Sequence, residues 1–258
     1  SWEMFHLSKA SKEIEKYCIL LASKHELVAI CENKYLMYKH FEGKIDVPQF
    51  YLVKTMAELV DAAEKLGYPE RDVVFKPPEG KGARGVRVLT EKSDRYDLLF
   101  NGRPFAKYIS MDELKSTVGE KEIPELMIME YLNGVELKID PVLQNGEMLT
   151  CSVKNRLNFA SGLAMGFEMI DDNEAINYAT NLLKHLPMDY CIDISTRGGV
   201  LMEINPRVST YIYSEKYCAP YLALQLAMGE MSASEVKSYQ TKLPIGKKMF
   251  RYYGQMDY

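Results

Sequence analysis

The sequence lacks the features of several large protein classes. It contains no apolar run near the ~20 residues that a membrane-spanning helix needs, and its first residues do not resemble a signal peptide. It also lacks a basic excess, because 32 lysines and arginines stand against 36 aspartates and glutamates, for a net charge of −4. That balance argues against general binding to nucleic acid or to anionic membranes. We therefore expect a protein with neither kind of partner.

Paired cysteines are missing as well. The five cysteines are dispersed and no two have C-x-x-C spacing, so we expect reduced thiols in a cytoplasmic protein. The four histidines and the cysteines form no catalytic pattern. What is present is the composition of an ordinary globular protein, 47% hydrophobic and 26% charged. At 258 residues, the chain is long enough for one large domain or two lobes.

One segment late in the chain combines two acids, an amide and an arginine. Asp193 opens a short apolar run, Gly198-Gly199 can form a tight turn, and Glu203-Ile-Asn205-Pro-Arg207 ends the return run. Carboxylate and amide oxygens are hard ligands that suit magnesium or calcium rather than zinc. Arg207 is placed to hold a phosphate or carboxylate near such a metal. Taken alone, an ordinary charged surface hairpin explains this segment equally well.

Capping patterns and turns divide the chain into helices and strands. Thr55 and Glu58 form a capping box, Ser110 and Asp172 can cap two more helices, and Asn145-Gly146 is a hairpin turn. The predicted elements are, in order, a helix over 9–23, a strand over 28–31, a helix from Asn33, a helix from Thr55 to Gly67, strands over 73–76 and 86–89, a helix from Ser110, a strand over 126–132, a hairpin over 136–156, a helix from Asp172, the hairpin over 193–207, a helix over 215–228 and a strand over 247–253. Helices mixed with hairpins indicate an α+β fold with antiparallel sheets.

The segment Gly80-Lys-Gly82-Ala-Arg84-Gly85 matches the pattern G-x-G-x-x-G. A dinucleotide-binding fingerprint must open into a helix, whereas Val86–Leu89 reads as a strand. Protein kinases also place a glycine loop between strands, but no His-Arg-Asp or Asp-Phe-Gly follows in this sequence. Exposed amides and cations suit such a loop to fold over a polyphosphate. A plain hairpin loop is the alternative.

Two single residues near these segments are candidates for nucleotide contacts. Lys76 ends the strand that enters the glycine loop. The strand would hold the backbone of this lysine in a fixed position, which suits a contact with phosphate. Glu136 carries a carboxylate that can accept two hydrogen bonds from paired ribose hydroxyls. In isolation, a lysine at a sheet edge and a solvated residue after a turn explain them as well.

Taken together and in this order, these segments resemble the ATP-grasp superfamily. The similar segments are Cys31–Tyr35, Val73–Pro78 with the glycine loop, Met129–Glu136, Ser152–Arg156, and Asp193 with Glu203-Ile-Asn205-Pro-Arg207. The last is especially similar to the carbamoyl-phosphate synthetase branch. The resemblance implies two α+β lobes with antiparallel sheets that grip ATP between them. It also implies three parts, namely a remnant of a truncated α/β domain (1–45), a small lobe with a glycine-rich lid (46–130) and a large lobe with a metal site (131–258).

The resemblance also implies a set of site residues. The implied magnesium ligands, with manganese as an alternative ion, are Asp193, Glu203 and Asn205. The implied ATP contacts are Lys34, Lys76, Gly82, Arg84, Gly85, Met129, Glu130, Tyr131, Leu132, Glu136 and Met202. The residues implied to face the transferring phosphate and the acyl substrate are Lys154, Arg156 and Arg207.

The function implied by this resemblance is an ATP-dependent ligase that joins a carboxylate to an amine through an acyl phosphate. Its partners would be these small-molecule substrates, and a homo-oligomer is one alternative for an oligomeric state that the sequence leaves open. Two alternative functions stay open. One is phosphorylation of bicarbonate, as in carbamoyl-phosphate synthetase, and the other is nucleotide binding without catalysis.

The sequence departs from the family pattern in two places. Asp193 and Glu203 are ten residues apart, which is short for the family's metal-binding hairpin. In addition, a hairpin that turns at Asn145-Gly146 without a bulge would place Asn155 opposite Glu136. Lys154 and Arg156 would then point to the other face of the sheet. Either a bulge intervenes, or only some of these residues reach the nucleotide.

Overall fold

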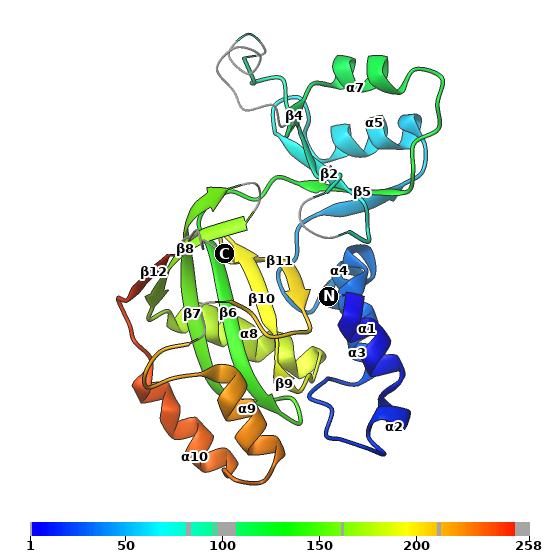
Figure 1. Ribbon diagram of the computed structural model, residues 1–258. Coiled ribbons are helices and arrows are strands. Elements are labelled where there is room, and N and C mark those ends of the chain that lie inside the picture. Colours follow the sequence, from blue (N-terminus) through cyan, green and yellow to red (C-terminus); the bar gives the residue numbers. More distant parts are fainter. Residues whose placement is uncertain are drawn as a thin grey trace, which may run out of the picture. The chain divides into compact units, whose positions relative to one another are not determined.

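The computed structural model of the chain (Figure 1) describes residues 2–80, 84–94, 96, 107–160, 163–210 and 213–250. The described chain forms two compact units. The smaller unit contains Asn33–Lys39 and Pro48–Asn133, and the larger contains Ser1–Glu32, His40–Val47 and Gly134–Tyr258. No helix among the described residues is both long and apolar enough to cross a membrane. The five cysteines are free thiols.

The smaller unit is a sheet covered by helices. Its described strands follow the order β1 (Phe50–Val53), β5 (Leu126–Glu130), β2 (Val73–Lys76), β3 (Arg87–Leu89) and β4 (Tyr108–Ile109). All neighbours are antiparallel except β3 and β4, which are parallel. Helices α5 (Met56–Lys65) and α7 (Met111–Val118) bury residues such as Leu59 and Leu114 in one core with strand residues such as Val73. This packing fixes β2, which leads into the glycine loop.

Local signals account for the helices of the smaller unit. The Thr55 hydroxyl accepts a hydrogen bond from the Glu58 amide, and the Glu58 side chain accepts one from the Thr55 amide, so the predicted capping box is confirmed. The Ser110 hydroxyl caps α7 by accepting a hydrogen bond from the Glu113 amide, at 3.2 Å. The Asn33 side chain accepts from the Leu36 amide at the start of α4 (Lys34–Phe41), as predicted.

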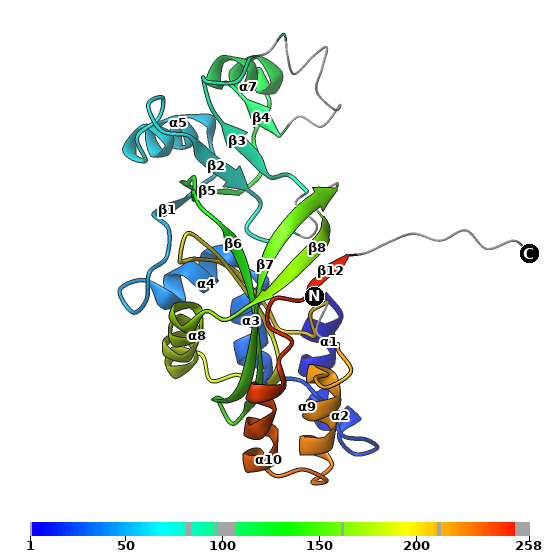
Figure 2. The ribbon, with the colours of Figure 1, turned by 90° about the vertical axis from the view of Figure 1, so that its left-hand side faces the viewer.

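The larger unit is built on a second sheet (Figures 1 and 2). Its described strands follow the order β11 (Val200–Asn205), β10 (Asp193–Arg197), β6 (Glu136–Gln144), β7 (Glu147–Ala160), β8 (Leu163–Ile170) and β12 (Lys248–Phe250), and β9 (Tyr190–Cys191) pairs with β6. Every pairing is antiparallel, as predicted for the hairpins.

Helices cover both faces of this second sheet. Helix α8 (Asn173–His185) packs against β6 and β7 on one face. On the other face, α9 (Ala219–Ala227) and α10 (Ala233–Ser238) enclose a core with Val142 of β6 and Leu149 of β7. A 3-10 helix (Tyr239–Lys242) follows α10.

The first 45 residues differ from the prediction. The predicted strand over 28–31 lies inside helix α3 (His25–Glu32), which buries Val28 and Cys31. The predicted helix over 9–23 is wrong too, because α1 (Trp2–Lys9) and α2 (Ser11–Ile14) end before residue 15. A four-residue apolar run cannot by itself distinguish a buried strand from a buried helix face.

Smaller differences occur at the ends of other elements. Strand β5 ends at Glu130 rather than residue 132, and the helix predicted over 215–228 begins at Ala219, where Pro220 occupies its first turn. The last strand, β12, covers Lys248–Phe250 and so begins one residue later than predicted, and residues 251–253 of the predicted strand lie outside the described residues.

Two glycines bring the hairpin of β10 and β11 close to the start of β6. Gly134 has a φ of +97°, and a Cβ added there would lie 3.0 Å from the Gly198 Cα. The Gly198 amide donates to the Val135 carbonyl at 3.1 Å. The Gly198-Gly199 turn is therefore held against the residues that precede Glu136.

We expect Gly134→Ala to lower the free energy of unfolding more than Gly43→Ala does. Both residues have positive φ, which costs an alanine about 1–2 kcal/mol, but a Cβ at Gly43 meets nothing within 4 Å. The close approach to Gly198 adds an overpacking cost of about 1 kcal/mol or more. Urea unfolding of the two variants tests the comparison, and equal losses would contradict the close approach.

Candidate functional site

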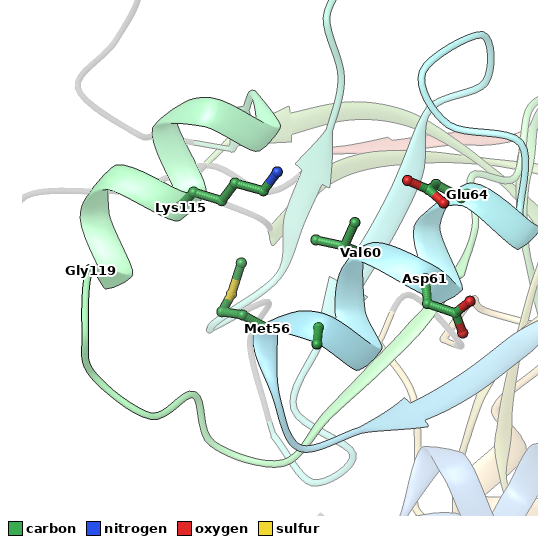
Figure 3. Close-up of a pocket in the computed structure, with 7 residues that line it drawn as sticks. Met56, Val60, Asp61, Glu64, Lys115 and Gly119 are labelled. Carbon is green, nitrogen blue, oxygen red and sulfur yellow. The ribbon is translucent and has the colours of Figure 1, made fainter.

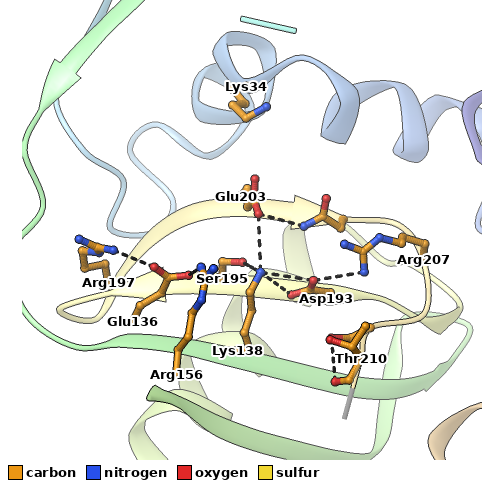
Figure 4. A network of polar contacts seen from close by, with 12 residues as sticks. Lys34, Glu136, Lys138, Arg156, Asp193, Ser195, Arg197, Glu203, Arg207 and Thr210 are labelled. Carbon is orange, nitrogen blue, oxygen red and sulfur yellow. Dashed lines mark hydrogen bonds and ion pairs between the residues drawn. The ribbon is translucent and has the colours of Figure 1, made fainter. Parts of the chain in front are cut away.

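Most of the predicted catalytic and metal-binding residues lie together on the sheet of the larger unit (Figure 4). We call this group the β6 charge network. It consists of Glu136, Lys138, Asp140, Lys154, Arg156, Asp193, Arg197, Glu203 and Arg207. Side chains alternate along a strand, so the three β6 members share the face on which Val142 packs against α9 and α10.

A β-bulge sets the register that makes this network. The pairing of β6 with β7 shifts between Val142 and Leu143, and Lys138 consequently lies opposite Lys154. Of the two alternatives that the sequence left open, the structure therefore contains the bulge. On the other side of β6, Lys138 lies opposite Ser195 and Glu136 lies opposite Arg197.

Glu136 is held between two guanidinium groups. Its carboxylate oxygens lie 2.5 Å from Arg156 Nη1 and 2.7 Å from Arg197 Nη2. Burial alone would raise the pKa of Glu136, but the hydrogen bonds and charges of Arg197 and Arg156 outweigh it and hold the pKa below its ordinary value. Glu136 therefore stays ionised. Its contact with ribose stays a prediction.

Lys138 occupies the centre of the network. Its Nζ lies 3.1 Å from Asp193 Oδ1 and 3.6 Å from Glu203 Oε1, and it donates a hydrogen bond to the Ser195 hydroxyl. Burial would lower the pKa of Lys138, but the charges of Asp193 and Glu203 outweigh burial and raise it. The ammonium is thus held between two of the three predicted magnesium ligands, as Figure 4 shows.

Lys154 lies at the buried end of the network. Its Nζ forms an ion pair with Asp140 at 2.7 Å and donates to the Thr210 carbonyl at 2.5 Å. The Lys154 side chain is fully buried. Burial raises the pKa of Asp140, and the nearby charge of Lys154 opposes that rise. Lys154 thus neutralises a buried carboxylate, and its contact with substrate stays a prediction.

The hairpin of β10 and β11 brings together the predicted metal ligands. Asp193 lies opposite Asn205, and a bulge between Ser195 and Thr196 places Glu203 opposite Ser195. The short ten-residue separation is therefore compatible with a common site. The Asn205 amide donates to Glu203 at 3.2 Å, and Arg207 lies 3.4 Å from Asp193.

These oxygen donors differ in their availability to a metal. The Glu203 side chain is 38% exposed, and the carboxamide oxygen of Asn205 adds a second hard donor beside it. In contrast, the Asp193 side chain is 3% exposed and lies within ion-pair distance of both Lys138 and Arg207. The set fits one magnesium ion on Glu203 and Asn205. Met202, an implied adenine contact, is the extra residue of the bulge in β11, because Leu201 pairs with Thr196 and Glu203 pairs with Ser195. Its contact with adenine stays a prediction.

In the smaller unit, Lys34 lies beside the start of the glycine loop. Its Nζ donates to the Gly80 carbonyl at 3.0 Å, and its backbone amide donates to the Pro78 carbonyl at 2.9 Å. The Asn33 amide group also contacts Glu79, at 3.1 Å. The chain thus brings together a predicted phosphate-binding lysine and the glycine loop, which lie 46 residues apart in sequence.

The glycine loop begins and ends close to Pro77. Gly85 has a φ of +74°, and a Cβ there would lie 2.8 Å from Pro77 Cδ. Arg84, which precedes it, is exposed. Lys76 is 9% exposed, and its Nζ lies 5.6 Å from the centroid of the Tyr38 ring, a cation–π distance. Gly82 lies outside the described residues.

The predicted adenine-binding strand is β5, which lies between β1 and β2 in the sheet of the smaller unit. Glu130 binds Gln49 twice, since its side chain accepts from the Gln49 amide at 3.0 Å and its own amide donates to the Gln49 carbonyl at 3.1 Å. The Tyr38 hydroxyl lies 3.9 Å from the sulfur of buried Met129. The next two residues, Tyr131 and Leu132, are half-buried beyond the end of the strand.

A pocket on the smaller unit lies apart from these residues. It is located at α5 and α7 (Figure 3) and is lined by Met56, Ala57, Val60, Asp61, Glu64, Lys115 and Gly119. None of the predicted site residues lines it. The pocket therefore gives no support to a nucleotide site.

Comparisons with known proteins find similar sequences and structures. The family described as "ATP-grasp in the biosynthetic pathway with Ter operon" matches residues 122–247. The carbamoyl phosphate synthase large chain of Thermomicrobium roseum is 22% identical over 205 residues, which cover 74% of this chain and 17% of that protein. This family model covers just under half of the chain, so the sequence similarity to ATP-grasp proteins holds for that part. The alignment covers less than a fifth of this large relative.

Solved structures show the ATP-grasp fold. Carboxyaminoimidazole ribonucleotide synthase from Aspergillus clavatus, complexed with ATP, superposes with a TM-score of 0.64 at 13% identity, over 89% of this chain and 59% of that chain. L-amino acid ligase from Bacillus licheniformis superposes with a TM-score of 0.58 at 18% identity, over 88% of this chain and 55% of that chain. The predicted α+β ATP-grasp fold is confirmed.

Sequence reasoning missed three members of the network, Lys138, Asp140 and Arg197. A signal for the first two was present, since Glu136-x-Lys138-x-Asp140 places three charges of alternating sign on one face of a strand. Arg197 had no comparable signal, because its contact with Glu136 depends on the pairing of β10 with β6.

We expect Glu136→Gln to lower the free energy of unfolding by about 3–5 kcal/mol, because it leaves two partly buried guanidinium groups without their carboxylate. The matched control on the same sheet is Glu168→Gln. Glu168 lies 3.9 Å from the exposed Lys248, a pair of a kind that contributes about 1 kcal/mol at most. Urea unfolding at neutral pH measures both, and similar losses would contradict the role of Glu136.

The Glu136 contribution also depends on pH. Since its pKa is lowered in the folded chain, the stability it contributes is fully present above the ordinary pKa of 4.5 and is lost as pH falls through the folded value. The difference in free energy of unfolding between the parent and Glu136→Gln should therefore shrink on going from pH 7 to about pH 3. A difference that is constant over this range would contradict an ionised Glu136.

Proposed function

We propose that this chain is the ATP-grasp region of an ATP-dependent ligase that joins a carboxylate to an amine. The β6 charge network is the observation that carries the proposal. Five of its members are cationic and four are acidic, and one of the acids is the oxygen donor Glu203, which contacts Lys138 and Asn205. Cationic side chains near hard oxygen ligands suit a polyphosphate bound together with a divalent metal.

The proposed reaction has two steps. The substrate carboxylate attacks the γ-phosphorus of ATP, the bond from that phosphorus to the bridging oxygen breaks, and ADP leaves with the bond's electron pair. The amine then attacks the carbonyl carbon of the acyl phosphate, inorganic phosphate leaves, and the nitrogen loses a proton. Neither step needs a side-chain nucleophile, in keeping with cysteines and histidines that form no catalytic pattern.

The proposed roles follow from where the residues lie. In the smaller unit, Lys34 and Lys76 would bind phosphates, since both lie at the glycine loop. In the larger unit, Arg156 and Arg207 would stabilise negative charge on the transferring phosphoryl group. A magnesium ion bound at Glu203 would neutralise charge on the phosphates. The glycine loop would exclude water, which hydrolyses acyl phosphates.

Two known proteins with this fold support a ligase function. They are the L-amino acid ligase of Bacillus licheniformis and the carboxyaminoimidazole ribonucleotide synthase of Aspergillus clavatus, which was solved in complex with ATP. The division into lobes over residues 46–130 and 131–258 belongs to the same proposal. So do the remaining ATP contacts, which are Gly82, Arg84, Gly85, Met129, Glu130, Tyr131, Leu132, Glu136 and Met202.

A second function is favoured by a specific segment. Glu203-Ile-Asn205-Pro-Arg207 resembles the carbamoyl-phosphate synthetase branch, and the Thermomicrobium roseum relative is a large chain of that enzyme. In that case the carboxylate would be bicarbonate and the amine would be ammonia. Nucleotide binding without turnover is the alternative from another class.

Release of ADP separates these functions. The full chain is incubated with ATP and magnesium, and ADP is measured across panels of carboxylic acids and amines and with bicarbonate plus ammonium. ADP that depends on an organic acid and an amine supports the ligase, and ADP that depends only on bicarbonate supports the second function. ATP binding without stimulated turnover on any panel would overturn both.

We expect Glu203→Gln and Arg207→Ala each to lower the rate of substrate-dependent ADP release at least about 100-fold, because the first weakens the proposed magnesium site and the second removes a positive charge proposed to stabilise the transferring phosphoryl group. The control is Lys184→Gln, on the exposed side of α8. Its rate should equal that of the parent chain. Equal rates for all three variants would remove the β6 charge network from the proposed mechanism.

A further inference from the structure

The position of Lys138 conflicts with a simple metal site. Its ammonium lies between two predicted metal ligands, 3.1 Å from Asp193 and 3.6 Å from Glu203, and its third contact is the Ser195 hydroxyl. The ammonium donates hydrogen bonds to Asp193 and Ser195, and its contact with Glu203 is an ion pair. The Lys138 side chain is 12% exposed and lies on a strand that is paired on both sides. Its Nζ is therefore held in place by the sheet as well as by charge.

A divalent ion that bridged Asp193 and Glu203 would compete with this ammonium. Magnesium binds oxygen at about 2.0–2.1 Å, so a bridging ion would lie in the space that the Lys138 Nζ occupies. The two cations would also repel each other strongly in a site screened from water. Asp193 has a further cationic neighbour in Arg207, at 3.4 Å.

We propose that the ammonium of Lys138 takes the place of a metal ion between Asp193 and Glu203, so that this site binds a single divalent cation, on Glu203 and Asn205. Two-metal phosphoryl-transfer sites use the second ion to neutralise developing charge. Here a lysine fixed by the fold supplies one of those positive charges. Asp193 then orients Lys138 and Arg207 and is not a metal ligand, in contrast to the assignment implied by the family resemblance.

A structural ion pair that a metal displaces is the competing explanation. It predicts that Lys138 moves aside and that the number of bound ions does not depend on the lysine. Counting bound ions distinguishes the two explanations, and it does so without measuring turnover.

The experiment counts Mn²⁺ ions by electron paramagnetic resonance of the free ion. The full chain and Lys138→Met are titrated with Mn²⁺, with and without a non-hydrolysable ATP analogue. We expect one Mn²⁺ per nucleotide-bound chain for the parent and two for Lys138→Met. Without nucleotide, Lys138→Met should bind Mn²⁺ at least about tenfold more tightly, because a positive charge beside the ligands is gone.

Two further variants control for folding and for charge. Lys138→Arg keeps the positive charge and should bind one ion. Lys248→Met removes an exposed lysine from β12 of the same sheet and should behave as the parent. Two ions on the parent chain would overturn the proposal even if Lys138→Met failed to fold, as would unchanged Mn²⁺ number and affinity in a folded Lys138→Met.

The titration with the ATP analogue rests on the proposed ATP-dependent function. The inference about Lys138 and the proposed function can nevertheless fail separately. If the parent chain does not bind the ATP analogue, the proposed function fails. The titrations without nucleotide still decide whether Lys138 excludes a cation from the carboxylates.

Discussion

Neutralisation of the charges on strand β6 is the constraint on which the larger unit depends. Strand β6 is paired on both sides, and Glu136, Lys138 and Asp140 point to one face of its sheet. The partner of each charge therefore lies on β7, β10 or β11. Lys138 even lies opposite another lysine, Lys154, and this pairing is tolerable only because Asp193 and Asp140 lie beside the two ammonium groups. A shift in register of one residue would separate every one of these pairs.

The same neutralisation makes the site suitable for chemistry on phosphates. Charged side chains held by each other keep their orientation before substrate arrives, and preorganised charge stabilises a transition state more than charge that must rearrange. Exposure to solvent differs along the network. The Asp140–Lys154 pair is buried, whereas Glu203 is more exposed than the other acids. Buried pairs fix the scaffold, and Glu203 offers oxygen donors to a metal.

The elements with strong local signals were predictable, and the network was only partly so. The Thr55 capping box and the Asn145-Gly146 turn depend on neighbouring residues, and both agree with the structure. The strand predicted over 28–31 was wrong because a short apolar run fits a buried helix as well. The partners of Lys138 could not be predicted, because they depend on a bulge between Val142 and Leu143 that no residue type there requires.

The central claim is that this network serves transfer of the γ-phosphate from ATP to a carboxylate. The direct measurement uses an acid that supports turnover, labelled with ¹⁸O in its carboxylate, followed by mass analysis of the inorganic phosphate released. An acyl-phosphate route delivers one carboxylate oxygen to each phosphate, so the account predicts one ¹⁸O per phosphate. Phosphate without the label would show that water or another acceptor attacks ATP, and would contradict it.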